Sequence, residues 1–160
     1  MDTEKLRIES ASEADIPLLL EFIKELAAYE ELRDHVDVTE ERLRQAVFGK
    51  DSRADAVIAY FDELPVAFAI YFFSFSTFEG RPGLYIEDIF VRPSFRKFGI
   101  GRKLFAFLSQ TARERGCFRI ELSVLNWNEQ AIEFYKKLGG EPVDGWTVFR
   151  FSEKAITDLN

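Results

Sequence analysis

A basic loop with two glycines constrains this chain more than any other stretch. Residues 96–101 read RKFGIG, after an apolar run at 84–91 and before a helical-looking segment that starts at Arg102. The first-turn N–H groups of a helix lack internal acceptors and carry partial positive charge. Glycines allow a positive φ and let an anion approach the backbone closely. The pattern therefore predicts a strand, an anion-binding loop and a helix.

Two other phosphate-binding loops fit this stretch less well. A P-loop needs Gly-Lys-Ser/Thr, whereas Arg102, Lys103 and Leu104 follow Gly101. A dinucleotide-binding fingerprint needs a third glycine where Leu104 stands. Glu121 does fall at about the distance of the ribose-binding acid of that fingerprint, which is the one feature in its favour.

The rest of the chain alternates between strand-like and helix-like patterns, with no internal repeat or linker. Ser12 with Asp15, Thr39 and Asn128 are predicted to cap helices. The helices are expected to reach about residues 30, 48 and 138, and another is expected over about 101–116. Strands are expected at 6–9, 54–61, 66–73, 84–91, 120–124 and 146–151, with 74–83 as a loop.

Composition excludes several classes of protein. The net charge of −7 argues against a nucleic-acid partner. With one cysteine, Cys117, and one histidine, His35, neither an internal disulfide nor a metal site of these residues is expected. No apolar run approaches the ~20 residues of a membrane span, and the N-terminus is acidic rather than basic and apolar. These features predict a cytoplasmic protein with no membrane partner.

Charge is unevenly distributed along the chain. Six basic residues and no acidic residue lie between Arg92 and Arg113, and six acidic residues and one arginine lie between Glu30 and Glu41. Two solvated helix faces would explain both blocks. Because the basic block coincides with the anion-binding loop, we interpret it as the partner of a polyanionic cofactor. The acidic block would then steer a cationic acceptor toward the protein.

The pattern Arg-x-x-Gly-x-Gly at 96–101 resembles that of the GCN5-related N-acetyltransferases (GNAT), and most of all that of the spermidine/spermine (diamine) and thialysine acetyltransferases. Four further segments in the same order carry the resemblance over nearly the whole chain: 26–30, 85–91, 127–137 and 145–146. It implies a single domain over 1–160 with the α/β GNAT fold. That fold is a mixed, mostly antiparallel central sheet with a splayed strand pair and helices on both faces.

The resemblance implies acetyl-CoA as co-substrate, without a metal. Main-chain N–H groups of the loop would bind its pyrophosphate, and the backbone of the preceding strand would pair with its pantetheine arm. The predicted cofactor-binding residues are Ile89, Phe90, Val91, Arg96, Lys97, Phe98, Gly99, Ile100, Gly101, Arg102, Asn128, Ala131, Tyr135 and Lys137.

Acetyl transfer also needs a neutral amine, although an alkyl ammonium has a pKa of ~10.4. A carboxylate can bind the cation and pass its proton to water. The family pattern gives this catalytic role to Glu87, and strand alternation predicts that Glu87 and Asp88 lie on opposite faces. A strand-end salt bridge is the alternative for Glu87. The predicted acceptor-binding residues are Tyr29, Glu30, Glu87, Asp144 and Trp146, which combine carboxylates with aromatic walls for a cation.

The departing coenzyme A thiolate needs a proton donor. By the same resemblance Tyr135 is the second catalytic residue and donates that proton through its hydroxyl. Asn128 lies two helical turns earlier on the same face, where the family contacts the cofactor. The alternative is a core tyrosine with a bonded hydroxyl.

The predicted function is transfer of an acetyl group from acetyl-CoA to a primary amine of a polyamine or of a thialysine- or lysine-like amino acid, by direct attack in a ternary complex. The alternatives are a protein or peptide N-acetyltransferase and a non-catalytic acyl-CoA sensor. Residues 78–80 align only roughly with the aromatic-glycine turn of the polyamine enzymes, so the acceptor stays open. The sequence also leaves open whether Glu87 acts as a base or only binds the ammonium. The resemblance implies a homodimer.

Overall fold

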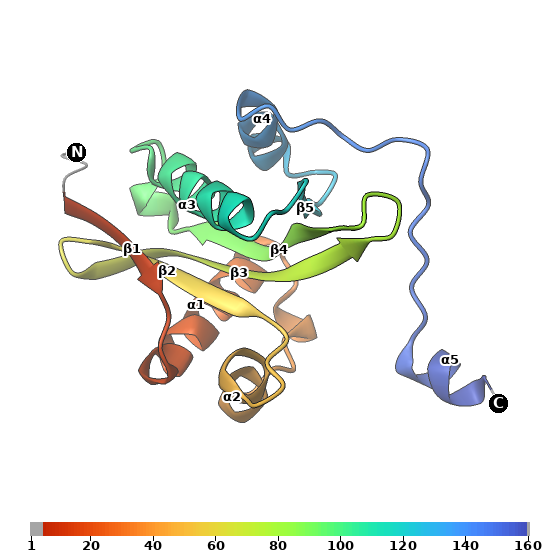
Figure 1. Cartoon of the computed structure of the whole chain (residues 1–160). Helices are drawn as coiled ribbons and strands as arrows, with labels where there is room; N and C mark the ends of the chain where they lie inside the picture. Colours follow the sequence, from red (N-terminus) through yellow and green to blue (C-terminus); the bar gives the residue numbers. More distant parts are fainter. Residues whose placement is uncertain (1–4, 160) are drawn as a thin grey trace. The chain divides into compact units, whose positions relative to one another are not determined.

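The structure is a computed structural model that describes residues 5–159 (Figure 1). It divides into two compact units, Met1–Leu125 and Asn126–Asn160. The first unit contains the strands β1 (Leu6–Ser10), β2 (Asp55–Phe61), β3 (Leu64–Ser76), β4 (Arg81–Val91) and β5 (Ile120–Leu122). Its α-helices are α1 (Ile16–Tyr29), α2 (Glu40–Phe48) and α3 (Ile100–Glu114). The second unit contains α4 (Glu129–Lys137) and α5 (Glu153–Asp158).

The strands of the first unit form one sheet in chain order, β1-β2-β3-β4-β5. Neighbouring strands from β1 to β4 are antiparallel, and β5 is parallel to β4. A parallel neighbour requires a crossover connection, which α3 provides. The expectation of a mixed, mostly antiparallel sheet is therefore confirmed.

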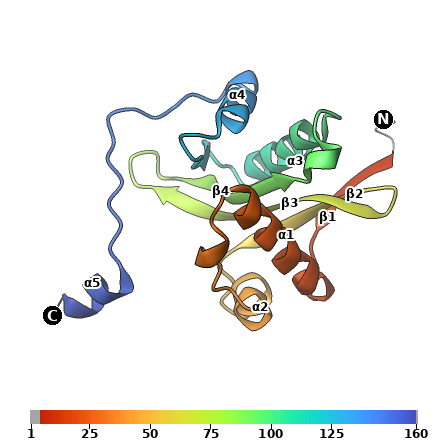
Figure 2. The same cartoon turned by 180° about the vertical axis from the view of Figure 1, so that it is seen from behind.

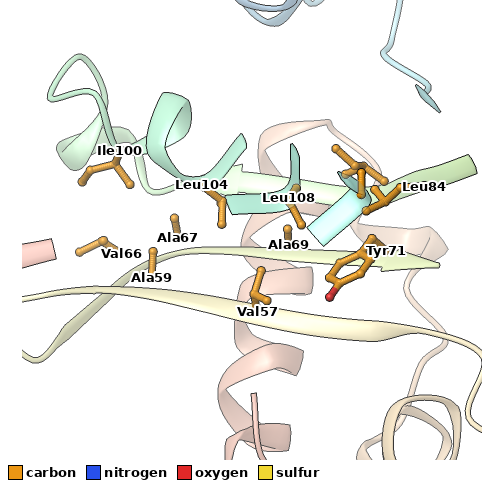
Figure 3. Packing of buried hydrophobic residues seen from close by; sticks show 12 residues of the cluster. Val57, Ala59, Val66, Ala67, Ala69, Tyr71, Leu84, Ile100, Leu104 and Leu108 are labelled. Atoms are coloured by element: carbon orange, nitrogen blue, oxygen red, sulfur yellow. The ribbon is translucent and has the colours of Figure 1, made fainter. Parts of the chain in front are cut away.

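Helices cover both faces of this sheet, as expected. Helix α3 lies over one face, and α1 and α2 lie over the other (Figure 1 and Figure 2). Ile100, Leu104 and Leu108 form the buried stripe of α3 and face two alanines of β3, Ala67 and Ala69 (Figure 3). These small side chains leave room for the helix to pack closely, which fixes the start of α3 relative to the sheet.

Larger side chains fill the opposite face. Ile16, Leu19 and Phe22 of α1 are fully buried, and the Phe22 ring stacks on Phe68 of β3 with centroids 5.1 Å apart. Full burial of one such side chain stabilises the fold by about 1.5–3 kcal/mol. This packing holds α1 in place and thereby positions Tyr29 at its C-terminal end.

The predicted helix caps are present. Asp15 accepts hydrogen bonds from the backbone N–H and the hydroxyl of Ser12. Thr39 Oγ1 accepts a backbone N–H of α2, and Asn128 Oδ1 accepts the N–H of Ala131 in α4. A cap contributes about 1 kcal/mol, so local sequence suffices to start these helices.

The prediction of a loop over 74–83 is wrong for most of this range. The ladder between β3 and β4 continues outward and pairs Ser74 with Gly83, leaving only residues 77–80 as the turn. A Cβ on Gly83 would lie 2.8 Å from Ser74 Oγ, so glycine here serves close strand contact. Pro82 lacks an N–H, but its carbonyl accepts the N–H of Phe118. Glycine and proline therefore occur within this strand.

The prediction of a strand over 146–151 is also wrong. This segment pairs with no strand among residues 5–159, and the chain then forms α5, whose first turn is capped by Ser152. Large apolar side chains are exposed along it, with Trp146 79% and Phe149 80% exposed. An alternating pattern does not make a strand unless a neighbouring chain pairs with its backbone.

Candidate active site

The predicted anion-binding loop lies between β4 and α3. A 3-10 turn, Pro93–Phe95, follows β4, and α3 begins at Ile100. Lys97 and Gly99 adopt positive φ angles of 67° and 80°. This conformation is ordinary for glycine but strained for lysine, and it turns neighbouring main-chain N–H groups toward one side. The loop therefore has the backbone form of an anion site at a helix start.

The side chains of the loop fall into two groups. Lys97, Phe98 and Arg102 are exposed, so their side chains are accessible to a ligand. Ile100 is buried under α3, so only its backbone is available for the predicted cofactor contact. The exposed cations Lys97 and Arg102 thus flank, in the sequence, the main-chain N–H groups of residues 98–101.

Arg96 takes a different position from these exposed cations. Its guanidinium carbon lies 4.2 Å from the centroid of the Tyr29 ring and 5.5 Å from that of Phe90. Its Nε donates a hydrogen bond to the Val91 carbonyl at 3.0 Å. The structure therefore places a predicted cofactor residue against a predicted acceptor residue.

β4 carries an extra residue at Glu87. Ile70 of β3 pairs with Asp88, and the next residue of β3 pairs with Ile86, which leaves Glu87 as a bulge. Ile86 belongs to the core under α3, whereas Phe90 belongs to the core that α1 covers. Two residues four apart would share a face in a regular strand. The bulge therefore places Ile86 and Asp88 on opposite faces and removes the regular alternation on which the prediction for Glu87 and Asp88 was based.

The carboxylates of Glu30, Glu87 and Asp88, here called the carboxylate face, interact with one another. Burial raises the pKa of Asp88 to about 6, and the negative charges of Glu87 and Glu30 add to the effect. Burial also raises the pKa of Glu30, the residue that follows α1. Such a group favours a bound cation, which would relieve the repulsion. A carboxyl that titrates near neutral pH also suits general-base catalysis.

β4 and β5 part after three paired residues. Their ladder joins Leu84–Ile86 to Ile120–Leu122, so β5 is shorter than expected. The hydroxyls of Tyr85 and Ser123 lie 2.7 Å apart where the strands separate. Beyond this point, residues 88–91 pair only with β3 among the described residues. This is the splayed pair expected of the fold, and its open backbone edge suits an extended, amide-containing ligand.

Arg92 has a role that the sequence pattern did not reveal. Its guanidinium donates to Glu25 at 2.9 and 2.7 Å, to Glu21 at 2.6 Å and to the Pro65 carbonyl at 2.8 Å. These bonds tie the end of β4 to α1, so the charge of Arg92 serves the scaffold and not the basic surface predicted for the cofactor. The sequence feature that could have indicated this role is the four-residue spacing of Glu21 and Glu25, which places both on one helix face.

The second unit carries the remaining predicted residues. Asn128 is buried at the start of α4, and the Tyr135 ring packs against Phe134 with centroids 5.4 Å apart. Helical spacing places Asn128, Ala131 and Tyr135 on one side of this helix. The other predicted residues of this unit are exposed, namely Lys137 on α4 and Asp144 and Trp146 in the segment that follows it. Their roles stay predictions.

Residues 5–159 contain no group of three or more histidine, cysteine, aspartate and glutamate side chains that could hold a metal ion. None of the helices in this range has the length and apolar character needed to cross a membrane. The candidate site of the first unit thus consists of the loop, the open strand edge and the carboxylates Glu30, Glu87 and Asp88.

Comparison with known proteins identifies relatives along most of the chain. The model of the Acetyltransferase (GNAT) family matches residues 19–140. Thialysine N-epsilon-acetyltransferase of Bos taurus is 37% identical over 163 residues, which cover 95% of each chain. Spermidine/spermine N(1)-acetyltransferase-like protein 1 of Homo sapiens is 31% identical over 163 residues, which cover 96% of this chain and 23% of that protein.

A solved structure supports the fold independently of sequence. An integron cassette protein from the mobile metagenome of V. cholerae superimposes with a TM-score of 0.81 over 97% of both chains. Its sequence identity of 24% is low, so this likeness concerns the fold alone. The order of strands and the helices on both faces of the sheet are therefore those of an established architecture.

Proposed function

Because the chain belongs to the acetyltransferase (GNAT) family and is an N-acetyltransferase, we propose that it transfers an acetyl group from acetyl-CoA to a primary amine of a small cationic acceptor. The amine attacks the thioester directly while both substrates are bound, and residues 1–160 work as one domain. The observation that carries the proposal is the contact of Arg96, in the anion-binding loop, with Tyr29 beside the carboxylate face. Donor and acceptor sites must adjoin for group transfer.

The first unit supplies the main part of the acetyl-CoA site. The main-chain N–H groups of 97–101 bind the diphosphate, and exposed Lys97 and Arg102 add positive charge. The open edge of β4 at Ile89, Phe90 and Val91 pairs with the amides of the pantetheine arm. The positive φ angles of the loop and the short β4–β5 ladder support this assignment.

The carboxylate face receives the amine. Glu87, which is exposed, binds the ammonium together with Tyr29 and Glu30. Asp88 follows Glu87 at the bulge, and its pKa of about 6 lets it accept a proton through water near neutral pH. Glu87 and Asp88 thus act as a pair: one holds the cation, and the other removes its proton.

The second unit supplies the proton for the leaving group. Tyr135 donates its phenolic proton to the coenzyme A thiolate, and Asn128, Ala131 and Lys137 contact the cofactor. Asp144 and Trp146 complete the acceptor site. These five assignments and that of Tyr135 rest on the sequence resemblance.

Two acceptor classes follow from the relatives, one named for thialysine and one for spermidine and spermine. The test is thiol release from acetyl-CoA with spermidine, spermine, diaminopropane, thialysine, lysine and basic peptides, each offered separately. Turnover with a small amine and not with peptides supports the proposal. Turnover with peptides alone would make the protein a peptide acetyltransferase, and binding of acetyl-CoA without any turnover would make it a sensor.

We also propose a cytoplasmic homodimer. The exposed apolar side chains after α4, such as Trp146 and Phe149, would gain by burial against a partner. Light scattering coupled to size exclusion should give twice the chain mass for the wild type. The double variant Trp146→Ser, Phe149→Ser should give the mass of one chain, and two chains in the variant would remove this segment from the interface.

A further inference from the structure

Arg96 joins two parts of the proposed site. Its half-buried guanidinium stacks on the Tyr29 ring at 4.2 Å, and its Nε bonds to the Val91 carbonyl at 3.0 Å. The Phe90 ring lies on the same side, 6.1 Å from the Tyr29 ring. The side chain is therefore held between the C-terminal end of α1 and the C-terminal end of β4.

This anchor lies directly before the bend of the loop. The backbone of Arg96 is extended, with φ −72° and ψ 161°, and the next residue, Lys97, takes the strained positive φ. A side chain fixed at Arg96 therefore fixes the point from which the loop turns its N–H groups. Tyr29 is the last residue of α1, and Glu30 follows it, so the same contact reaches the acceptor side.

We propose that Arg96 is a positioning residue that couples the acceptor pocket to the cofactor loop. Tyr29 holds the Arg96 side chain, and Arg96 holds the loop in the conformation that binds coenzyme A. The inference rests on the proposed function, because it assumes that the loop binds the diphosphate. It follows that a change at Tyr29 weakens coenzyme A binding even when no amine is present. Coupling of this kind is reciprocal, so an amine that packs on Tyr29 also alters coenzyme A affinity.

The rival account treats Arg96 as a direct phosphate ligand. In that case removal of the Tyr29 ring would release the guanidinium toward the phosphates and leave coenzyme A affinity unchanged or raised. The rival also lets lysine replace arginine, since a charge alone would suffice. The stacked position instead needs the planar guanidinium, which lysine lacks.

The test is calorimetric titration of coenzyme A into the full chain, without amine. The four proteins are the wild type, Tyr29→Leu, Arg96→Met and the double variant. We expect Tyr29→Leu to raise the Kd about fivefold, the effect of one cation–π contact. In the Arg96→Met background the same change should alter the Kd less than twofold. Arg96→Lys should bind as weakly as Arg96→Met.

A matched control lies elsewhere on the sheet. Arg7 of β1 stacks on the Tyr60 ring of β2 at 4.7 Å, which is a similar pair without a loop or acceptor residue, so Tyr60→Leu should leave the Kd unchanged. Far-UV circular dichroism shows whether each variant is folded. If Arg96→Met does not fold, Arg96→Lys takes its place as the more conservative variant.

Three results would overturn the coupling. They are an unchanged or lower Kd in Tyr29→Leu, an equal effect of that change in both backgrounds, and wild-type affinity in Arg96→Lys. Each of these leaves the proposed function intact, because the wild type still binds coenzyme A. If the wild type does not bind coenzyme A at all, the proposed function and the coupling both fail.

Discussion

Replacing Asp88 by asparagine should remove a pH-dependent loss of stability. Burial and the charges of Glu87 and Glu30 raise the pKa of Asp88 from 3.8 to about 6 in the native state. The protonated form is therefore favoured by folding. Its stabilising effect is complete below the unfolded value of 3.8 and is lost as the pH rises through about 6. At about 1.4 kcal/mol per pKa unit, ionisation of Asp88 destabilises the native state by about 3 kcal/mol.

The assay is urea unfolding followed by tryptophan fluorescence between pH 5 and 8. About half of the effect falls in this range, so the wild type should lose about 1.4 kcal/mol more stability than Asp88→Asn as the pH is raised. At pH 8 the variant should be the more stable protein by about 3 kcal/mol. Asp34→Asn, which removes an exposed carboxylate, is the matched control, and its profile should run parallel to that of the wild type.

Parallel profiles of the wild type and Asp88→Asn would refute this reasoning. They would mean that Asp88 is solvated in the native state and is not affected by the charges of Glu87 and Glu30. In that case the carboxylate pair of the proposed mechanism would lose its physical basis, whatever the activity of the variant.

Three further predictions concern Gly99 in the loop, the proposed proton donor Tyr135, and Arg92, which ties β4 to α1. Gly99→Ala should lower stability by only about 1 kcal/mol, because an added Cβ meets no atom within 4 Å. The same methyl would obstruct the diphosphate, so the coenzyme A Kd should rise about tenfold in calorimetry. An unchanged Kd would exclude the loop as the diphosphate-binding site. Tyr135→Phe should keep coenzyme A affinity and lower kcat about 10²-fold or more in the thiol-release assay, whereas equal turnover would remove Tyr135 from the mechanism. Arg92→Met should lower the free energy of unfolding by about 2 kcal/mol, since it breaks charged hydrogen bonds to Glu21 and Glu25, and no change would show that they do not hold β4.

Features encoded by short stretches of sequence were predicted well. The bend at 97–99 is set by a glycine and by the helix start that follows, and the caps at Ser12, Thr39 and Asn128 need only a few neighbouring residues. The buried stripe of α3 follows from its helical spacing. These features depend on backbone preferences and periodicity, which a single sequence displays directly.

Three details that depend on contacts between distant segments were not predicted. The bulge at Glu87 is a matter of register between β3 and β4, and no residue type within β4 marks it. The ion pairs of Arg92 join residues 67 and 71 positions apart. The segment 146–151 alternates like a strand, but its partner cannot be read from its own residues. The most important error, the assumption of regular alternation at Glu87 and Asp88, arose in this way.

The central claim is that the main-chain N–H groups after Arg96 bind the diphosphate of the acetyl donor. A crystal structure with coenzyme A tests it most directly. We expect the diphosphate oxygens within hydrogen-bond distance of the N–H groups of 97–101, and the thiol beside Glu87 and the Tyr135 hydroxyl. A diphosphate bound elsewhere on the protein would contradict the claim.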